Sequence, residues 1–243
     1  ELYRLFVSGE ILETDATTAE LIKLMENTYR DVNIAVANEF SRVADRYGVD
    51  VWEAISLANR HPRVNILNPG PGVGGHCISV DPWFLVEGAP ALTPLIASAR
   101  RVNDAQPAFV VELVKRGVGG LKGKRIAALG LAYKPNVDDV RESPAAEVVR
   151  LLHAEGAIVS AWEPYRPAAS LPGIEAAQSL EAALSGADAI LLLVAHTEFA
   201  RLSPDETAKK STARIAIDTS HAWDAAAWRQ AGFSFFRLGS PQS

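Results

Sequence analysis

Apolar residues recur at intervals of three and four positions over residues 17–47, TTAELIKLMENTYRDVNIAVANEFSRVADRY. This spacing is typical of an amphipathic α-helix. Thr17 and Glu20 have the spacing of a capping box at its start, and Gly48 is a plausible stop. The predicted helix is much longer than the usual ~11–12 residues and carries apolar residues on more than one face. We therefore expect it to form the subunit interface of a homodimer.

Shorter helical patterns follow, until the composition changes at residues 119–125, GGLKGKR. The first is VDVWEAISLANR. A second begins at Asp81, which is expected to be the N-cap because Pro82 suits the first helical position. The last runs to about residue 118, with a break expected near Pro107.

Beyond residue 125, apolar runs alternate with amphipathic helical segments, the first of which has Ser143 as its expected N-cap. This alternation predicts right-handed crossovers and a parallel, doubly wound sheet. The runs expected to form strands are RIAALGLAY, AIVSAWEP, ADAILLLVAH, RIAIDTS and FSFFRLG.

The sequence thus predicts an α/β chain with two main parts. A helical domain over residues 15–118, expected to be the dimerisation domain, precedes a Rossmann-like doubly wound parallel-sheet domain over residues 119–243. Residues 1–14, ELYRLFVSGEILET, begin in mid-helix with Glu1 rather than Met. We expect them to be the tail of a further, N-terminal domain.

Composition and charge argue against several kinds of partner and location for this protein. The 243 residues carry a net charge of −5, which argues against a nucleic-acid partner and against an anionic membrane surface. Apolar runs stay below the ~18 residues of a membrane span. A single cysteine excludes an intrachain disulfide framework and fits a cytoplasmic location. No metal site is expected.

The single cysteine, Cys77, lies in PGPGVGGHCISVDP, residues 69–82. A free cysteine is commonly an inert, buried small residue. The glycines before it, however, would let a ligand approach the backbone closely, and a helix beginning at Asp81 would help to stabilise a thiolate. Both interpretations stay open on these residues alone. The glycine spacing does not match the dinucleotide fingerprint G-x-G-x-x-G, which the chain lacks throughout.

Polar residues form a stripe on the predicted long helix. Lys23, Asn27 and Arg30 lie at i, i+4 and i+7, which places them on one face. They are either a solvated surface or groups directed into a cleft. In a cleft, the lysine would stabilise an oxyanion or relay a proton.

Two further cations lie close to the first strand of the predicted sheet. Lys134 follows RIAALGLAY, and ligands of open α/β sheets bind at the carboxyl ends of strands. Arg141 precedes the helix capped by Ser143, so the two could share a phosphate. The alternative for Arg141 is an ordinary loop ion pair with Asp138 or Asp139.

Three motifs occur in order: AELIKLMENTYRDVNIAVANE, NRHPRVNILNPGPGVGGHCISVDPWFL and LGLAYKPNVDDVRESPA. Together they resemble the nucleotide-sugar 6-dehydrogenases, the UDP-glucose/GDP-mannose dehydrogenase family, over about residues 1–221. In that family an NAD-binding domain precedes a helical domain with a dimerising helix and a UDP-binding domain. The resemblance implies that this chain holds the last two, with residues 1–14 left from the first.

The resemblance also implies a chemistry, in which the C6 alcohol of a UDP-sugar is oxidised to a carboxylate with two NAD+. Cys77 would be the nucleophile that carries a thiohemiacetal and then a thioester. Lys23 would transfer protons and stabilise the oxyanion, and Asn27 and Asp81 would position the reacting oxygen or water. The implied substrate contacts are Arg30, His61, Arg63, Gly74, Tyr133 and Lys134, of which His61 and Arg63 would reach in from a partner subunit, and the implied NAD contact is Arg141.

This sequence departs from the family pattern in two places. Without the fingerprint, the chain alone is expected to bind NAD poorly and to turn over little. Ser220 also stands where close relatives tend to carry a basic residue, so one ionic contact to UDP is in doubt.

These motifs allow several hypotheses about the substrate and the function. HPRVN and PGPGVGGHC favour the branch of the family that acts on UDP-N-acetyl-D-mannosamine, although no residue reads the configuration at C2. The alternatives are UDP-N-acetylglucosamine or UDP-glucose as substrate and a non-catalytic UDP-sugar-binding or dimerisation module. A cysteine acyl-transfer enzyme is disfavoured because a strand-borne base is missing.

Overall fold

The long amphipathic pattern forms one continuous helix, α1 (Ala16–Tyr47), in the computed structural model, which describes residues 2–167, 169 and 171–241. Gly48 ends it in the left-handed conformation, as predicted. The predicted capping box at its start is wrong, because the N-cap is Asp15, whose side chain accepts a hydrogen bond from the Thr18 N–H. Before α1, a 3₁₀ helix, η1 (Leu2–Leu5), leads into an irregular stretch over residues 10–15.

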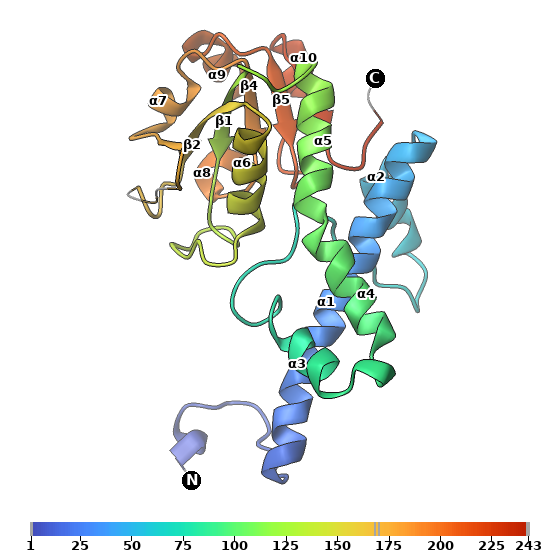
Figure 1. The fold of residues 1–243 in the computed structure, drawn as a ribbon. Coiled ribbons are helices and arrows are strands. Elements are labelled where there is room, and N and C mark those ends of the chain that lie inside the picture. Colours follow the sequence, from blue (N-terminus) through green and yellow to red (C-terminus); the bar gives the residue numbers. More distant parts are fainter. Residues whose placement is uncertain (1, 168, 170, 242–243) are drawn as a thin grey trace.

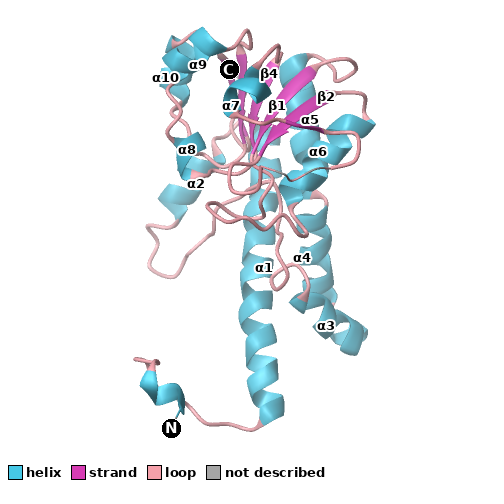
Figure 2. Ribbon diagram, turned by 90° about the vertical axis from the view of Figure 1, so that its left-hand side faces the viewer, coloured by secondary structure: helices cyan, strands magenta, loops and turns pink. Residues whose placement is uncertain are grey.

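Three helices lie alongside α1. They are α2 (Val51–Ala58), α3 (Asp81–Gly88) and α4 (Pro94–Asp104), with a 3₁₀ turn, η2 (Pro90–Leu92), between the last two. Figures 1 and 2 show α1 extending away from the sheet as a stalk, with α3 and α4 beside it. The predicted break near Pro107 is present, since α4 ends before Ala105 and α5 (Gln106–Val118) begins after it.

Within the described residues, parallel strands form one six-stranded sheet in the order β3-β2-β1-β4-β5-β6. This is the strand order of a Rossmann fold, and it confirms the predicted doubly wound sheet. The sequence pattern missed β3, because an edge strand of two residues has too short an apolar run to be recognised. The strands are β1 (Arg125–Leu129), β2 (Ile158–Trp162), β3 (Glu175–Ala176), β4 (Ala189–Leu192), β5 (Ile215–Asp218) and β6 (Ser234–Arg237).

Helices cover both faces of the sheet. One face packs against α5 and α6 (Pro144–Ala154), and the other against α7 (Leu180–Leu184), α8 (Thr197–Ala200) and α10 (Ala225–Gln230). Alternate residues of β1 enter the two cores, as the period of a strand requires. Ser143 caps α6, as predicted. Ser203 caps α9 (Pro204–Lys210), a helix that was not predicted from the sequence.

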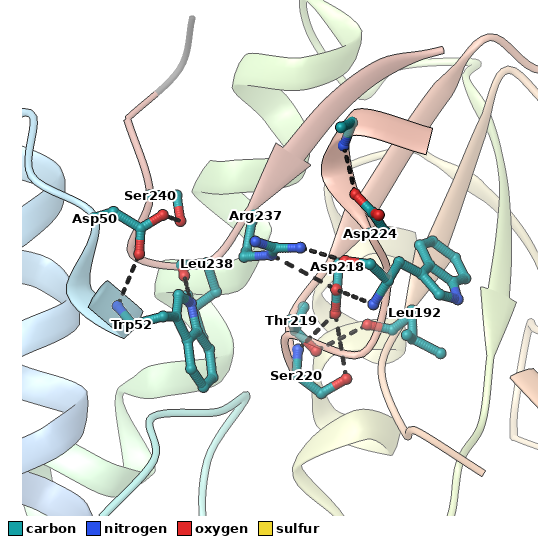
Figure 3. A network of polar contacts seen from close by, with 12 residues as sticks. Asp50, Trp52, Leu192, Asp218, Thr219, Ser220, Asp224, Arg237, Leu238 and Ser240 are labelled. Carbon is teal, nitrogen blue, oxygen red and sulfur yellow. Dashed lines mark hydrogen bonds and ion pairs between the residues drawn. The ribbon is translucent and has the colours of Figure 1, made fainter. Parts of the chain in front are cut away.

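Contacts between α2 and the segment after β6 hold the helical part against the sheet (Figure 3). The Trp52 indole N–H donates to the Leu238 carbonyl at 2.8 Å, and the Ser240 hydroxyl donates to the Asp50 carboxylate at 2.7 Å. The same Asp50 carboxylate caps α2. Helix α5 is another connection between the two parts, because it packs on the sheet and follows α4 directly.

Candidate active site

A cavity of about 410 Å³ lies between α1, the Pro/Gly-rich loop and the segment that follows β1. These three segments are far apart in the sequence, and they meet at the carboxyl end of β1, where ligands of such sheets bind. Six of the residues selected from the sequence line this cavity: Asn27, Arg30, Gly74, Cys77, Tyr133 and Lys134.

Asn27 and Asp81 join α1 to α3 beside the thiol. The Asn27 amide, on a side chain that is 6% exposed, donates to the Asp81 carboxylate at 2.5 Å. Helix α3 begins at Asp81 itself, with Val80 as an N-cap that makes no side-chain bond. The prediction that Asp81 is the N-cap is therefore wrong. Its carboxylate lies in the first turn of α3, where it holds an amide of the cavity wall.

Cys77 is exposed and lines the cavity. Its carbonyl accepts the Asp81 N–H at 2.8 Å, so one tight turn carries both the thiol and the carboxylate. The interpretation of this cysteine as buried core filler does not hold in the structure. An accessible thiol in a cavity that Arg30 and Lys134 also line has the electropositive surroundings typical of a nucleophilic cysteine.

The glycine at position 74 serves packing rather than ligand clearance. A Cβ placed on Gly74 would lie 2.5 Å from Cδ of Pro144 and would also collide with the Glu142 carbonyl oxygen. The space that a side chain would fill is thus occupied by the segment leading into α6. The expectation that the missing side chain makes room for a ligand is wrong at this residue. Gly74 instead lets the cysteine loop lie directly on the sheet domain.

Two cations face the cavity from different elements, Arg30 on α1 and Lys134 after β1. Within the described part of the chain, neither forms an ion pair. Lys134 Nζ lies 5.4 Å from the centre of the Tyr133 ring, a cation–π arrangement. Cations without acidic partners at the carboxyl edge of a sheet are suited to bind a phosphate or diphosphate.

Four further predicted site residues lie away from this cavity, whereas Asp81 borders it through its bond to Asn27. Lys23, one turn before Asn27, is exposed and its ammonium lies 3.6 Å from the Glu26 carboxylate. His61 and Arg63 lie in the exposed loop after α2, where the Arg63 N–H donates to His61 Nδ1 at 3.2 Å. The structure therefore does not bring these three residues to the thiol.

Arg141, the fourth, forms the loop ion pair that the sequence left as an alternative. Its guanidinium donates to both oxygens of Asp139 at 3.0 and 2.8 Å. The pKa of Asp139 is held well below its usual value by hydrogen bonds from the Arg141 side chain, the Arg141 backbone N–H and the His76 ring. His76 Nε2 lies 2.7 Å from Asp139. His76 lines the cavity and was not selected from the sequence, although it directly precedes Cys77.

Ser220 closes the turn after β5. Its backbone N–H and its hydroxyl both donate to Asp218 Oδ1, at 2.9 and 3.3 Å (Figure 3). Arg237 Nε lies 3.7 Å from the same carboxylate. The position where a basic residue was expected thus carries a hydroxyl that is used within the turn.

A second cavity of about 300 Å³ lies between the cysteine loop, α4 and the start of α6. Four of its five charged side chains pair with each other, Arg100 with Asp104 and Arg150 with Glu147. Because the single cysteine and the two unpaired cations line the first cavity, we take the first as the candidate site.

The described residues provide neither a metal-binding cluster nor a membrane-spanning helix. They contain no group of three His, Cys, Asp or Glu side chains arranged to hold a metal ion. None of the described helices is both long and apolar enough to cross a membrane.

Comparison with known proteins identifies relatives for both parts of the chain. The model of the UDP-glucose/GDP-mannose dehydrogenase family, central domain, matches residues 17–105, and that of the family's UDP-binding domain matches residues 127–225. A UDP-N-acetyl-D-mannosamine dehydrogenase of Methanocaldococcus jannaschii is 49% identical over 98% of this chain. An NDP-N-acetyl-D-galactosaminuronic acid dehydrogenase of Ralstonia solanacearum is 52% identical over 92% of it.

A solved structure of a UDP-D-ManNAc dehydrogenase from Pyrococcus horikoshii superposes with a TM-score of 0.87 at 41% identity, covering 100% of this chain. The chain covers 55%, 52% and 56% of these three proteins, respectively. It thus spans about half the length of the relatives it matches.

Proposed function

Because the chain belongs to the UDP-glucose/GDP-mannose dehydrogenase family, we propose that it supplies the thiol and the UDP-binding part of an enzyme that oxidises UDP-N-acetyl-D-mannosamine at C6. The product would be the corresponding uronate. One observation carries the proposal: a single cavity is lined by the exposed Cys77, by Asn27, whose amide Asp81 holds, and by two unpaired cations.

The residues that line this cavity include groups suited to both parts of a nucleotide sugar. Arg30 and Lys134 would bind the diphosphate, since a compact anion gains most from cations that lack an acidic partner. The ring of Tyr133 and the backbone near Gly74 would contact the sugar. The sugar C6 would then reach the sulfur of Cys77.

The thiol chemistry follows from the groups around the sulfur. The Cys77 thiolate would add to the C6 aldehyde, forming a carbon–sulfur bond while the carbonyl oxygen takes up a proton. After oxidation of this adduct to a thioester, water would attack the same carbon and the thiolate would leave, which yields the carboxylate. The Asn27 amide would donate to the reacting oxygen, and Asp81 would hold that amide and position the water.

Lys23 has a proposed role that requires a different rotamer. Its ammonium would stabilise the oxyanion or donate a proton to it, but it lies beside Glu26 on the exposed helix face. Because the ion pair is exposed and such pairs contribute little, the lysine is free to exchange that partner for a substrate oxygen one turn along α1.

The oxidant proposed for this family is NAD+, which accepts a hydride in each of the two oxidations. The described residues do not form a glycine-rich turn that would bind the pyrophosphate of NAD+. The turn after β1 reads GLAYKP, and a Cβ on Gly130 would lie 2.5 Å from Cβ of Val194. This glycine therefore allows close packing against the segment after β4, not the approach of a pyrophosphate. Arg141 is the one residue for which we propose an NAD contact, and we assign no hydride-transfer step to this chain.

The mannosamine substrate has one specific competitor. The relative from Ralstonia solanacearum, whose name refers to an N-acetyl-D-galactosaminuronic acid, is slightly more identical to this chain than the archaeal mannosamine enzyme. A UDP-N-acetylgalactosamine-type substrate is therefore the second candidate. The coverage of the archaeal relative is broader, at 98% against 92% of the chain, which favours mannosamine.

We also propose a homodimer through α1. Buried residues of α1 pack against α4, whereas an apolar stripe on roughly the opposite side is exposed. Exposed apolar side chains at this spacing are expected to be covered by a second copy. His61 and Arg63 would then reach the partner's cavity. The stripe consists of Ile22, Met25, Tyr29, Val36, Phe40, Val43 and Tyr47.

The single cysteine allows a direct test. Iodoacetamide labelling of the chain reports Cys77 alone, so the alkylation rate can be followed by intact mass. We expect rapid labelling that rises with pH, and we expect UDP-N-acetyl-D-mannosamine to slow it more than UDP-glucose or UDP-N-acetylgalactosamine does. A thiol that stays inert across the neutral pH range would favour a non-catalytic module. Equal protection by all three sugars would contradict the proposed specificity.

A further inference from the structure

A carboxylate and an imidazole are buried together at the carboxyl ends of β2 and β4. Glu163 is 2% exposed and His196 is fully buried. His196 Nε2 lies 3.0 Å from Glu163 Oε2. A buried charge is costly unless hydrogen bonds satisfy it, so the partners of Glu163 indicate what the pair does.

Those partners are backbone amides of loops. Glu163 Oε2 accepts the N–H groups of Leu131 and Ala132 at 2.7 and 2.9 Å, and Oε1 accepts the Tyr165 N–H at 3.1 Å. His196 Nδ1 accepts the Asn136 N–H at 2.8 Å. The pair thus holds both ends of the segment 131–136, which contains Tyr133 and Lys134 of the candidate site.

The far end of this segment has further restraints. Asn136 has a positive φ of 60°, a left-handed conformation that asparagine adopts more readily than most other non-glycine residues. Its side-chain oxygen accepts the Thr197 N–H at 2.9 Å and the Tyr165 hydroxyl at 3.1 Å. Tyr165 also stacks on the His196 ring, with centroids 4.9 Å apart.

These contacts fix the protonation of His196. A backbone N–H only donates, so Nδ1 must be an acceptor without a proton. The ring proton is then on Nε2, where it is donated to the ionised Glu163. His196 is neutral in this arrangement, and a second proton on Nδ1 would expel the Asn136 amide.

We propose that Glu163 and His196 are positioning residues of the UDP-sugar site. They touch no substrate, but they hold the segment 131–136 at both ends so that Tyr133 and Lys134 stay directed at the cavity of Cys77. This inference rests on the proposed function, since it assumes that the cavity binds UDP.

The test measures UDP binding to the chain by titration calorimetry. His196→Leu removes the acceptor for Asn136 and the donor to Glu163, and we expect the dissociation constant to rise about tenfold or more, because each lost hydrogen bond is worth about fivefold. His196→Asn retains an acceptor near the position of Nδ1, so we expect binding within about threefold of the unsubstituted chain. Val159→Ala, a core substitution in β2 that leaves the pair intact, controls for general loss of stability.

A second variant applies if His196→Leu does not fold. Glu163→Gln places one amide N–H against another donor, whichever way the side-chain amide is turned. We expect faster hydrogen exchange at Leu131, Ala132 and Asn136 and weaker UDP binding, whereas Val159→Ala should change neither.

The outcomes separate the two claims. UDP binding by the unsubstituted chain together with unchanged affinity and unchanged exchange in the Glu163 and His196 variants would overturn the positioning role and leave the proposed function intact. Failure of the unsubstituted chain to bind UDP would instead contradict the proposed function.

Discussion

The Asn27 amide donates to the Asp81 carboxylate at 2.5 Å, which connects α1 to the first turn of α3, four residues after Cys77. The contact is largely buried at Asn27, and it holds the amide in the wall of the cavity that the thiol lines. An amide fixed by a carboxylate loses little freedom when a substrate binds. The pair is therefore suited to orient one reacting oxygen next to the sulfur.

Loss of the Asp81 carboxylate should slow the chemical steps more than it weakens binding. In the complete dehydrogenase we expect Asp81→Ala to lower kcat for acid formation by roughly 10²-fold, because the Asn27 amide and the water lose their partner. The KM for the UDP-sugar should change little, since Arg30 and Lys134 are untouched. Asp205→Ala, at an exposed position in α9, is the matched control. An unchanged kcat would exclude a role for the pair in chemistry.

Several features of the fold follow from local signals and were therefore predictable. Gly48 and Ser143 mark helix ends through their own conformation and side chain, which is why both were identified correctly. The parallel, doubly wound sheet follows from the alternation of strands and helices. The predicted capping box at the start of α1 failed because a second capping residue is close by. Asp15 precedes Thr17 and is an equally good N-cap.

The site was predictable only in part, because its geometry depends on contacts between distant residues. The sequence rules that predicted an N-cap at Asp81 consider only neighbouring residues. They therefore do not predict the contact with Asn27, which is 54 positions earlier. Glu163 and His196 are 33 positions apart, and neither lies in a recognisable motif. Cys77, Arg30 and Lys134 were identified from motifs, but that they share one cavity is a result of the fold.

The two unpaired cations should dominate UDP affinity. We expect Lys134→Ala and Arg30→Ala each to raise the dissociation constant of UDP about tenfold, as loss of a charge-assisted hydrogen bond predicts. The effect should shrink as salt is added, because screening weakens both contacts. Lys122→Ala removes an exposed lysine outside the cavity and should bind UDP normally. Equal affinity in all variants, measured by calorimetry, would place the diphosphate elsewhere.

The buried Glu163 should make stability depend on pH. Burial raises its pKa, but hydrogen bonds from His196 and the Leu131 amide more than offset this, so its pKa in the folded protein is below the ordinary 4.5. The resulting stabilisation of the folded protein is present above pH 4.5. It is lost as the pH falls through the lower pKa that Glu163 has in the folded protein.

Urea unfolding of the unsubstituted chain and of Glu163→Gln measures the contribution of the ionised Glu163 to the free energy of unfolding. The difference in free energy of unfolding should be largest at neutral pH and should decrease below pH 4.5. A difference that stays constant, or that grows on acidification, would show that Glu163 is not held as a carboxylate by these bonds.

The exposed stripe of α1 should control association. Phe40→Glu places a charge in the middle of the apolar surface, and we expect it to weaken the dimer at least about tenfold, since burying an unpaired charge is costly. Leu95→Glu makes the same type of change at an exposed position of α4, which packs on the other side of α1. It should leave the dimer intact. Sedimentation velocity at micromolar concentration distinguishes the cases, and a monomeric unsubstituted chain would refute the interface.

The central claim is that the sulfur of Cys77 becomes bonded to the sugar C6. The most direct measurement is acid quenching of the complete dehydrogenase during turnover with NAD+ and UDP-N-acetyl-D-mannosamine, followed by mass spectrometry of the peptide that contains Cys77. The account predicts an acyl adduct with the mass of the UDP-sugar thioester on this peptide, and no acid formation by Cys77→Ala. Acid formation by Cys77→Ala at the normal rate, with an unmodified peptide in the quenched enzyme, would contradict it.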